Sequence, residues 1–104
     1  MPSLRQVNIS EAAEQDIRDI LQYTLETWGE RQRQTYTAQL MAGIERIAGF
    51  PGIGHEIRAR RPGVRGFRVR QHTIIFRAET ESITILRVAH ERMDLARLDL
   101  DEET

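Results

Sequence analysis

Residues 11–48 carry two helix-length amphipathic patterns, and a single glycine, Gly29, separates them. Apolar or small side chains recur at spacings of three and four residues, which is the period of one face of an α-helix. In the first pattern they are Ala13, Ile17, Ile20, Leu21, Thr24 and Trp28, and in the second they are Tyr36, Leu40, Ile44 and Ile47. A break of one or two residues forces the two helices to fold back on each other as an antiparallel hairpin. Each helix then hides its stripe against the other helix and against a further layer of structure.

The ends of both predicted helices are marked in the sequence. The first helix begins after Ser10, whose hydroxyl suits an N-cap, and it ends at Gly29. The second helix runs from about Glu30 to Ala48 and stops at Gly49 and Pro51, since glycine and proline commonly terminate a helix.

Strand-forming segments flank the hairpin on both sides. Leu4, Val7 and Ile9 mark a first strand, which ends at Ser10, before the hairpin. Three further segments rich in Val, Ile, Phe and Thr are separated by short turns, which predicts an antiparallel meander. They are Val64 to Arg70, Thr73 to Ala78 and Ile83 to Ala89. Residues 50–63, rich in glycine, proline and arginine, predict an irregular connection, and residues 94–98 predict a short final helix.

These elements predict an α+β fold over residues 1–104, taken as a single domain, in the order β-α-α-β-β-β with a short C-terminal helix. A small antiparallel sheet would carry the N-terminal helical hairpin on one face. The opposite face would stay open, because so short a chain has little left to cover it. By strand alternation Phe67 and Val69 would face the helices, whereas Arg68 and Arg70 would face outward and carry function.

The distribution of charge predicts an anionic partner. All 15 basic residues are arginine, and the formal net charge is -1. Seven arginines and a single acid, Glu56, lie between His55 and Arg77, whereas the residues after Met93 are mainly acidic. Such a cationic stretch fits an acidic protein segment or nucleic acid, and it equally fits a solvated basic surface. The chain has no cysteine, no signal-like start and no long apolar run, so we expect a cytoplasmic protein that does not enter membranes.

Few residues are suited to catalysis. His55, His72 and His90 show no metal-ligand spacing, so we expect no metal and no cofactor. His90 ends the last strand, where it could act as a general base or as a structural hydrogen-bonding group. Arg87 lies in a strand that looks buried on both sides, so it needs a partner, either Asp94 or an acid from the helices.

Three stretches together resemble the ParE branch of the RelE/ParE toxin superfamily. They are Phe50-Pro51-Gly52-Ile53-Gly54, His72-Thr73-Ile74-Ile75-Phe76-Arg77 and Leu86-Arg87-Val88-Ala89-His90-Glu91-Arg92-Met93-Asp94. The resemblance implies the toxin of a type II toxin-antitoxin system, of the kind associated with plasmid stabilisation. It also implies a hetero-oligomer with a ParD-like antitoxin, DNA gyrase as the target, and contact with DNA only through the antitoxin complex.

The RelE branch, whose members cut messenger RNA on the ribosome, is the alternative. RelE-type nucleases usually place an arginine where this chain has Thr73, and a tyrosine near the C-terminus, whereas no tyrosine follows Tyr36 here. The resemblance therefore implies a binding protein without catalytic residues. If the chain were a ribosome-dependent nuclease, His90 and Arg92 would carry the reaction. A third possibility is an inactive relative that only binds its antitoxin.

The predicted partner-binding surface combines arginines with exposed apolar side chains. Tyr23, Leu25 and Met41 lie off the main helix stripes, as exposed contacts or as the margin of a wide core stripe. The remaining predicted contact residues are Arg58, Arg60, Arg61, Arg68, Arg70, His90 and Arg92, together with the C-terminal segment.

Overall fold

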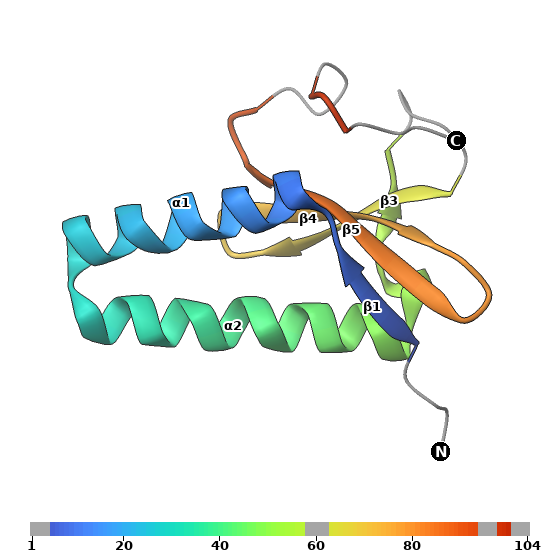
Figure 1. Cartoon of the computed structure of the whole chain (residues 1–104), viewed down its shortest axis with the longest axis horizontal. Coiled ribbons are helices and arrows are strands. Elements are labelled where there is room, and N and C mark those ends of the chain that lie inside the picture. The colour runs from blue at the N-terminus through green and yellow to red at the C-terminus, as the bar shows by residue number, and fades with distance from the viewer. Residues whose placement is uncertain (1–4, 58–62, 94–97, 101–104) are drawn as a thin grey trace.

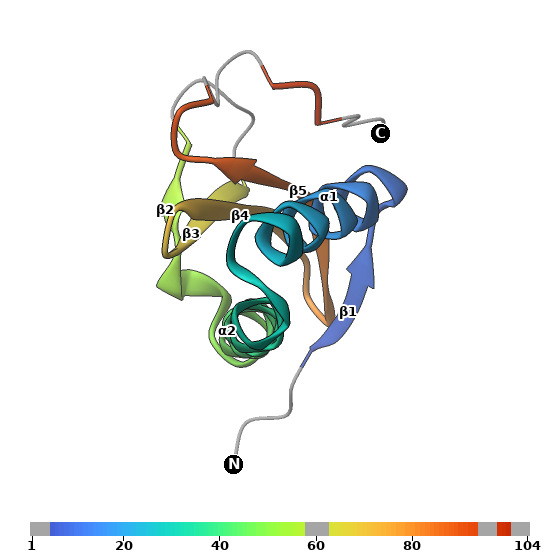
Figure 2. The same ribbon diagram turned by 90° about the vertical axis from the view of Figure 1, so that its left-hand side faces the viewer.

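A computed structural model describes residues 5–57, 63–93 and 98–100 of the chain, and it shows a helical hairpin packed on a five-stranded sheet (Figure 1). The elements are β1 (Gln6–Ile9), α1 (Glu11–Trp28), α2 (Glu30–Gly49), a 3-10 turn η1 (Pro51–Ile53), β2 (His55–Glu56), β3 (Val64–Val69), β4 (His72–Ala78) and β5 (Ser82–His90). Both helices lie on the same side of the sheet (Figure 2). Neither helix is long and apolar enough to cross a membrane.

Local chemistry sets the ends of the hairpin as predicted. The Ser10 hydroxyl accepts a hydrogen bond from the Ala13 N–H at 3.0 Å, which caps the first turn of α1. The same hydroxyl donates to the Leu86 carbonyl at 2.9 Å, so the cap also ties α1 to β5. Gly29 joins the helices with φ of 96°, a backbone conformation that glycine adopts without strain.

The predicted α+β fold, with the hairpin on one face of a small sheet, is confirmed, and one detail is corrected, because the sheet is mixed and not antiparallel throughout. Its strand order is β1-β5-β4-β3-β2, and β1 pairs with β5 in parallel while the other pairs are antiparallel. The meander is confirmed, but the hairpin returns the chain to the opposite edge of the sheet and leaves β1 beside the last strand. The segment predicted as irregular also contributes β2, which extends the other edge by two residues.

The main core lies between the hairpin and the sheet. It contains Leu40, Ile44 and Ile47 of α2 together with Ile74, Phe76, Ile83, Ile85 and Val88 of the central strands, all buried. Gly43 lets α2 approach β3 closely, since a Cβ there would lie 2.7 Å from Val69 Cγ2. Phe67 and Val69 pack against this core, as strand alternation predicts.

The opposite face of the sheet is also covered in part, so the prediction of an open face was wrong. Ile57, Val64, Ile75, Leu86, Ala89 and Leu100 form a second buried cluster there, and Leu98 packs against it. Leu100 is only 3% exposed. The prediction failed because residues 98–100 return to this face, which no local pattern indicates. The predicted final helix, Asp94 to Leu98, lies outside the described residues apart from Leu98.

The outer half of the hairpin extends beyond the sheet (Figure 1). Trp28 was predicted in the buried stripe of α1, but its side chain is 71% exposed. The spacing of Trp28 is correct for the stripe, and the prediction was wrong because the sheet does not reach under this end of the helix. The overhang leaves space between the two helices and the end of the sheet.

Candidate functional site

An open groove of about 1120 Å³ occupies the space under the overhang. Tyr23 and Trp28 line it from α1, Gln32 and Tyr36 from α2, and His72 and His90 from the ends of β4 and β5. Its two helical walls thus present aromatic rings, while the sheet presents groups that donate and accept hydrogen bonds. Such a mixture of apolar walls and a few convergent polar groups is typical of a binding site.

A hydrogen bond between Tyr36 and His72, with the His90 ring beside them, lies where the groove meets the sheet. The Tyr36 hydroxyl donates to the Val69 carbonyl at 3.1 Å and lies 2.6 Å from His72 Nδ1. A hydroxyl has one proton, so the arrangement that satisfies both contacts has His72 Nδ1–H donating to the Tyr36 oxygen. In neutral His72 the other ring nitrogen, Nε2, then carries no hydrogen. The His90 ring stands edge-on to His72, with 5.3 Å between ring centroids.

Partial burial shifts the pKa values of Tyr36 and His72. Burial raises the pKa of Tyr36 to about 12, although the nearby Arg70 charge acts in the opposite direction. Burial and the neighbouring His90 lower the pKa of His72 below its usual 6.5, and Glu91 and Asp16 oppose this shift more weakly. His72 is therefore neutral at pH 7, and Tyr36 remains a hydrogen-bonding phenol.

Arg70 enters the groove from the turn between β3 and β4. Its backbone φ is 57°, in the left-handed region that residues other than glycine rarely adopt. Its Nε donates to the Gln39 side-chain oxygen of α2 at 3.3 Å. Arg68 and Arg70 were predicted to share one face, and this was wrong for Arg70, because β3 ends at Val69 and the turn directs Arg70 to the helix side.

A second, smaller hollow of about 260 Å³ lies on the other side of the same sheet edge. His55, Arg68, Thr73 and Met93 line it, and His90 and Glu91 border both hollows. Arg68 faces away from the helices, as predicted, and forms an ion pair with Glu91. The guanidinium in this hollow is therefore already neutralised by a carboxylate of the chain itself.

An ion pair between α1 and β5 positions the end of β5. Arg87 donates to Asp16 from Nε at 2.7 Å and from Nη2 at 2.9 Å, and the Val88 N–H donates to the same carboxylate at 2.9 Å. Arg87 also donates to the Asp99 carbonyl at 2.8 Å. The hydrogen bond to Asp16 raises the pKa of Arg87 further above its usual value. The prediction that an acid from the helices serves as partner is confirmed.

An irregularity in the β4–β5 pairing lies directly before Arg87. Ile75 pairs with Arg87 and Phe76 with Ile85, so Leu86 has no partner opposite it in β4. Such a bulge turns the following side chains relative to the regular alternation. As a result, Leu86 packs in the second buried cluster, on the sheet face away from the helices, whereas Val88 packs in the main core beneath the helices.

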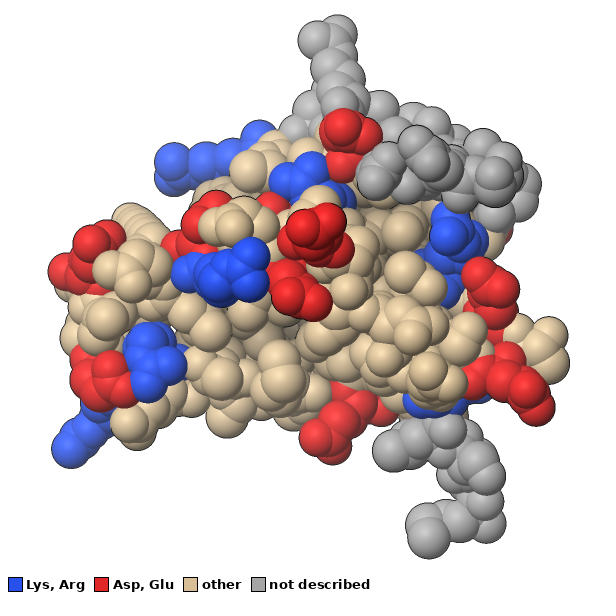
Figure 3. Space-filling view, in the orientation of Figure 1, with Lys and Arg blue, Asp and Glu red and all other residues tan. Residues whose placement is uncertain are grey.

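The predicted contact residues that the structure describes do not all lie on one surface. Arg70, Arg92 and Tyr23 line the groove, His90 stands between the two hollows, and Arg68 lines the smaller hollow. Leu25 is partly buried, and Met41 is 40% exposed on α2, outside both linings. Arg58, Arg60 and Arg61 lie outside the described residues. On the face shown in Figure 3, arginines and acids alternate instead of forming a block of one sign.

Several groove residues were missed in the sequence. Trp28 and Tyr36 were assigned to packing, and His72 was considered only as a metal ligand. The signal for Trp28 was its place next to Gly29, because a residue at the tip of a hairpin is the least covered by a short sheet. The Tyr36 ring does pack in the core, but its hydroxyl contacts His72 in the groove. The two residues are 36 positions apart, so only the packing of the helix on the sheet brings them together.

Comparison with known proteins gives consistent matches over most of the chain. Residues 7–95 match the family described as "ParE toxin of type II toxin-antitoxin system, parDE". Toxin ParE1 of Mycobacterium tuberculosis is 36% identical over 90 residues, which cover 86% of this chain and 92% of that protein. Toxin ParE1 of Caulobacter vibrioides is 32% identical over 91 residues, covering 88% and 94%. Toxin ParE of Escherichia coli is 34% identical over 84 residues, covering 80% and 82%.

Solved structures share the fold at lower identity. A chain of the chromosomal ParDE toxin-antitoxin system from P. aeruginosa has a TM-score of 0.71 at 17% identity, covering 84% of this chain and 96% of that chain. A chain of the RelBE2 toxin-antitoxin complex from Mycobacterium tuberculosis has a TM-score of 0.61 at 17% identity, covering 85% and 99%.

Proposed function

The chain belongs to the family of ParE toxins of type II toxin-antitoxin systems, and from this premise we propose that a ParD-like antitoxin neutralises it by binding in the groove and that its target is DNA gyrase. The groove under the hairpin overhang is the observation that carries the first part of this proposal. Solved relatives of the same fold come from ParDE and RelBE toxin-antitoxin systems.

The lining of the groove suits an amphipathic protein segment. Tyr23 is 56% and Trp28 71% exposed, and both belong to the residue types that dominate binding energy when a partner buries them. The arginines Arg70 and Arg92 line the same groove as these rings. A partner segment that alternates apolar and acidic side chains would bury the first against the rings and pair the second with the arginines.

The smaller hollow argues for a binding protein rather than a nuclease. Cleavage of RNA without a metal needs a base, an acid and cations around the phosphate. Among the described residues of this hollow, Arg68 is the one arginine, and Glu91 is its ion-pair partner. A phosphate would have to displace that carboxylate and would meet its negative charge. The smaller hollow therefore gives no support to a ribosome-dependent nuclease, and Arg92, one of the two residues predicted to carry that reaction, lines the groove instead.

Two assays on the purified chain, freed of antitoxin, separate these functions. One follows supercoiling of plasmid DNA by gyrase, and the other follows cleavage of a message on translating ribosomes. We expect supercoiling to stop at stoichiometric toxin while messages stay intact. Cleaved messages with unaffected gyrase would reject the gyrase proposal, and loss of that cleavage in His90→Ala would assign a nuclease.

Expression in living cells tests the remaining possibility, an inactive relative. Induction of the chain alone should arrest growth, and co-expression of the antitoxin encoded beside it should restore growth and yield a co-purifying complex. Normal growth with soluble, folded toxin would indicate a chain that only binds its antitoxin.

A further inference from the structure

We infer that the sheet end of the groove is a carboxylate subsite for the antitoxin, in which Arg70 and Arg92 pair with an acidic side chain and His72 takes up a proton on binding. This inference rests on the proposed function, because it assigns a role to one part of the groove in which the antitoxin is proposed to bind.

The first support is the convergence of positive groups from separate segments. Arg70 comes from the β3–β4 turn and Arg92 from the residues after β5, and both line the groove beside His72 and His90. Arg70 has a single side-chain hydrogen bond described, to the neutral Gln39. Its charge has therefore no carboxylate partner among the described contacts, in contrast to Arg68 and Arg87, which have Glu91 and Asp16.

The second support is the strained backbone at Arg70. A left-handed backbone conformation is strained for residues other than glycine. The turn holds Arg70 in this conformation, with φ of 57°, and thereby directs the guanidinium into the groove. Strain that persists at a residue lining a cavity is typical of a functional position.

The third support is the arrangement around His72, which allows it to gain a proton without losing its contacts. His72 Nδ1–H donates to the Tyr36 oxygen, so the incoming proton attaches to Nε2 and the existing hydrogen bond remains. The His90 Nδ1 accepts the Arg92 backbone N–H at 3.1 Å. His72 can thus gain a proton on Nε2 while it keeps its hydrogen bond to Tyr36.

The charges around His72 set the direction of the effect. Burial and the neighbouring His90 of β5 lower the pKa of His72 and so disfavour a positive charge on it, whereas Glu91 and Asp16 favour that charge. Tyr36 from α2 contributes a neutral hydroxyl. A carboxylate that pairs with Arg70 and Arg92 adds a negative charge nearby and raises the pKa of His72. By linkage, the affinity for that carboxylate increases as pH falls toward the histidine range.

A protein carboxylate fits the groove better than a nucleic acid phosphate. Asp19 and Glu91 also line it, and their charges oppose a polyanionic backbone. The aromatic walls made by Tyr23 and Trp28 suit the apolar side chains that flank an acid in an amphipathic segment.

The test uses the purified full chain and two blocked amphipathic peptides, one of leucine, alanine and glutamate and one with glutamine in place of glutamate. Binding is measured at constant ionic strength between pH 7.5 and pH 6, where glutamate stays ionised. We expect the glutamate peptide to bind about tenfold more tightly than the glutamine peptide, the effect of one charge-assisted hydrogen bond. Its affinity should rise toward pH 6, with proton uptake visible as a dependence of binding heat on the buffer.

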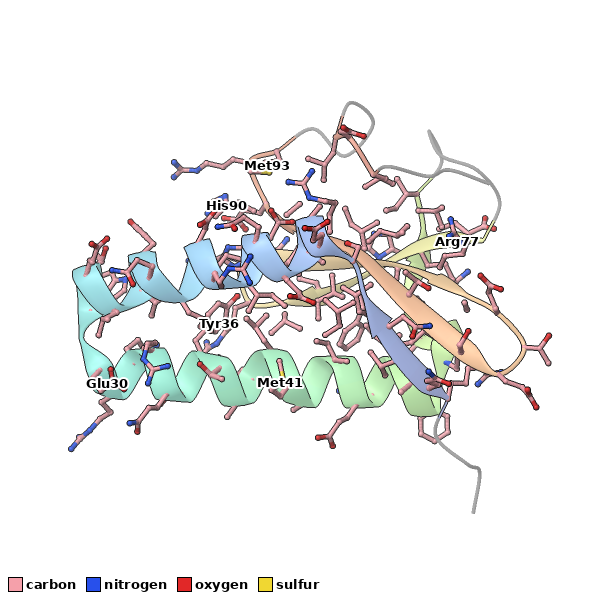
Figure 4. The ribbon with its side chains drawn as sticks, viewed as in Figure 1. Glu30, Tyr36, Met41, Arg77, His90 and Met93 are labelled. Atoms are coloured by element: carbon pink, nitrogen blue, oxygen red, sulfur yellow. The ribbon has the colours of Figure 1, made fainter. Side chains whose placement is uncertain are left out.

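Three variants assign the effect to residues. Arg92→Gln and Arg70→Gly should each weaken binding of the glutamate peptide about tenfold. Arg70→Gly also relieves the left-handed strain, so the loss cannot be attributed to unfolding when the thermal midpoint is unchanged or higher. His72→Gln should lose the rise in affinity toward pH 6, which is measured as the ratio of this variant's own affinities at pH 6 and pH 7.5. Arg77→Gln is the matched control, because Arg77 lies at the opposite end of the sheet from His90 (Figure 4).

Equal binding of the two peptides, or equal losses in Arg77→Gln and Arg92→Gln, would overturn the subsite. Affinity independent of pH in the parent chain would overturn the role of His72. These peptide-binding measurements contain no gyrase, ribosomes or antitoxin. Failure of the subsite is therefore measured separately from failure of the proposed function.

Discussion

Asp16 of α1 accepts two hydrogen bonds from the Arg87 guanidinium, at 2.7 and 2.9 Å, and a third from the Val88 backbone N–H at 2.9 Å. The two side chains are only 15% and 20% exposed. One carboxylate thus joins the first helix to the last strand, just before the strand reaches His90 and the groove. Because Arg87 also donates to the Asp99 carbonyl, the same arginine connects the helical layer with the segment on the opposite face.

Asp16→Asn should destabilise the chain by about 2–4 kcal/mol, because it leaves the Arg87 charge partly buried without a carboxylate. Denaturant unfolding followed by circular dichroism measures the change. Asp19→Asn, three residues along the same helix and exposed, is the control and should change stability by less than about 0.5 kcal/mol. Equal effects of the two substitutions would mean that the Asp16–Arg87 pair contributes no specific stability.

Gly43→Ala should destabilise the chain although alanine favours helices. The new methyl would lie 2.7 Å from Val69 Cγ2 and 3.3 Å from Ile74 Cδ1, so α2 has to move away from the sheet. Overpacking of this kind costs about 1–3 kcal/mol, against a gain in helix propensity of about 1 kcal/mol. Gly52→Ala is the matched control, since a Cβ there meets nothing within 4 Å. A higher melting temperature for Gly43→Ala would contradict the close approach of α2 and β3.

Acid should destabilise the chain through His72. The pKa of His72 in the folded chain is lowered from 6.5, so the unfolded chain binds the proton first as pH falls. Its contribution to stability is present above pH 6.5 and is lost as pH falls from there through the lowered folded-state pKa. Stability measured from pH 7.5 to pH 5.5 should fall less steeply in His72→Gln than in the parent. The exposed His55→Gln serves as control, and a parental slope in His72→Gln would refute the assignment.

Leu100→Ala should destabilise the chain by about 2 kcal/mol, because it removes a side chain that is 3% exposed from the second core. The same change should increase binding of a hydrophobic dye if the sheet face becomes exposed. Met93→Ala, at a side chain that is 50% exposed, should have little effect on either measurement. No loss of stability in Leu100→Ala would show that residues 98–100 do not cover this face in solution.

Trp28→Ala should weaken antitoxin binding by 2 kcal/mol or more, about thirtyfold, without lowering stability. The side chain is 71% exposed in the free chain, so its removal costs little in folding but much where a partner buries it. Calorimetry with the co-purifying antitoxin measures the change. Phe50→Ala, at a side chain that is 64% exposed and outside the groove lining, is the matched control. If Phe50→Ala weakens binding and Trp28→Ala does not, the antitoxin occupies another surface.

The sequence by itself determined every element whose signal is local. Ser10 fixed the start of α1 because a capping hydroxyl acts within one turn, and Gly29 fixed the tight reversal because it tolerates positive φ. The meander strands followed from short apolar runs between turns. The need of Arg87 for a carboxylate was also predictable, since an arginine in a strand flanked by apolar residues requires a partner.

Only the tertiary structure decided which distant segments meet. The parallel placement of β1 beside β5 and the return of Leu100 to the far sheet face depend on contacts across most of the chain. The groove exists because the helices are longer than the sheet beneath them, so the periodicity that marked Trp28 for burial could not indicate what lies opposite it. Helical and strand periodicity specify which residues share a face, whereas the length and position of the neighbouring layer decide whether that face is covered.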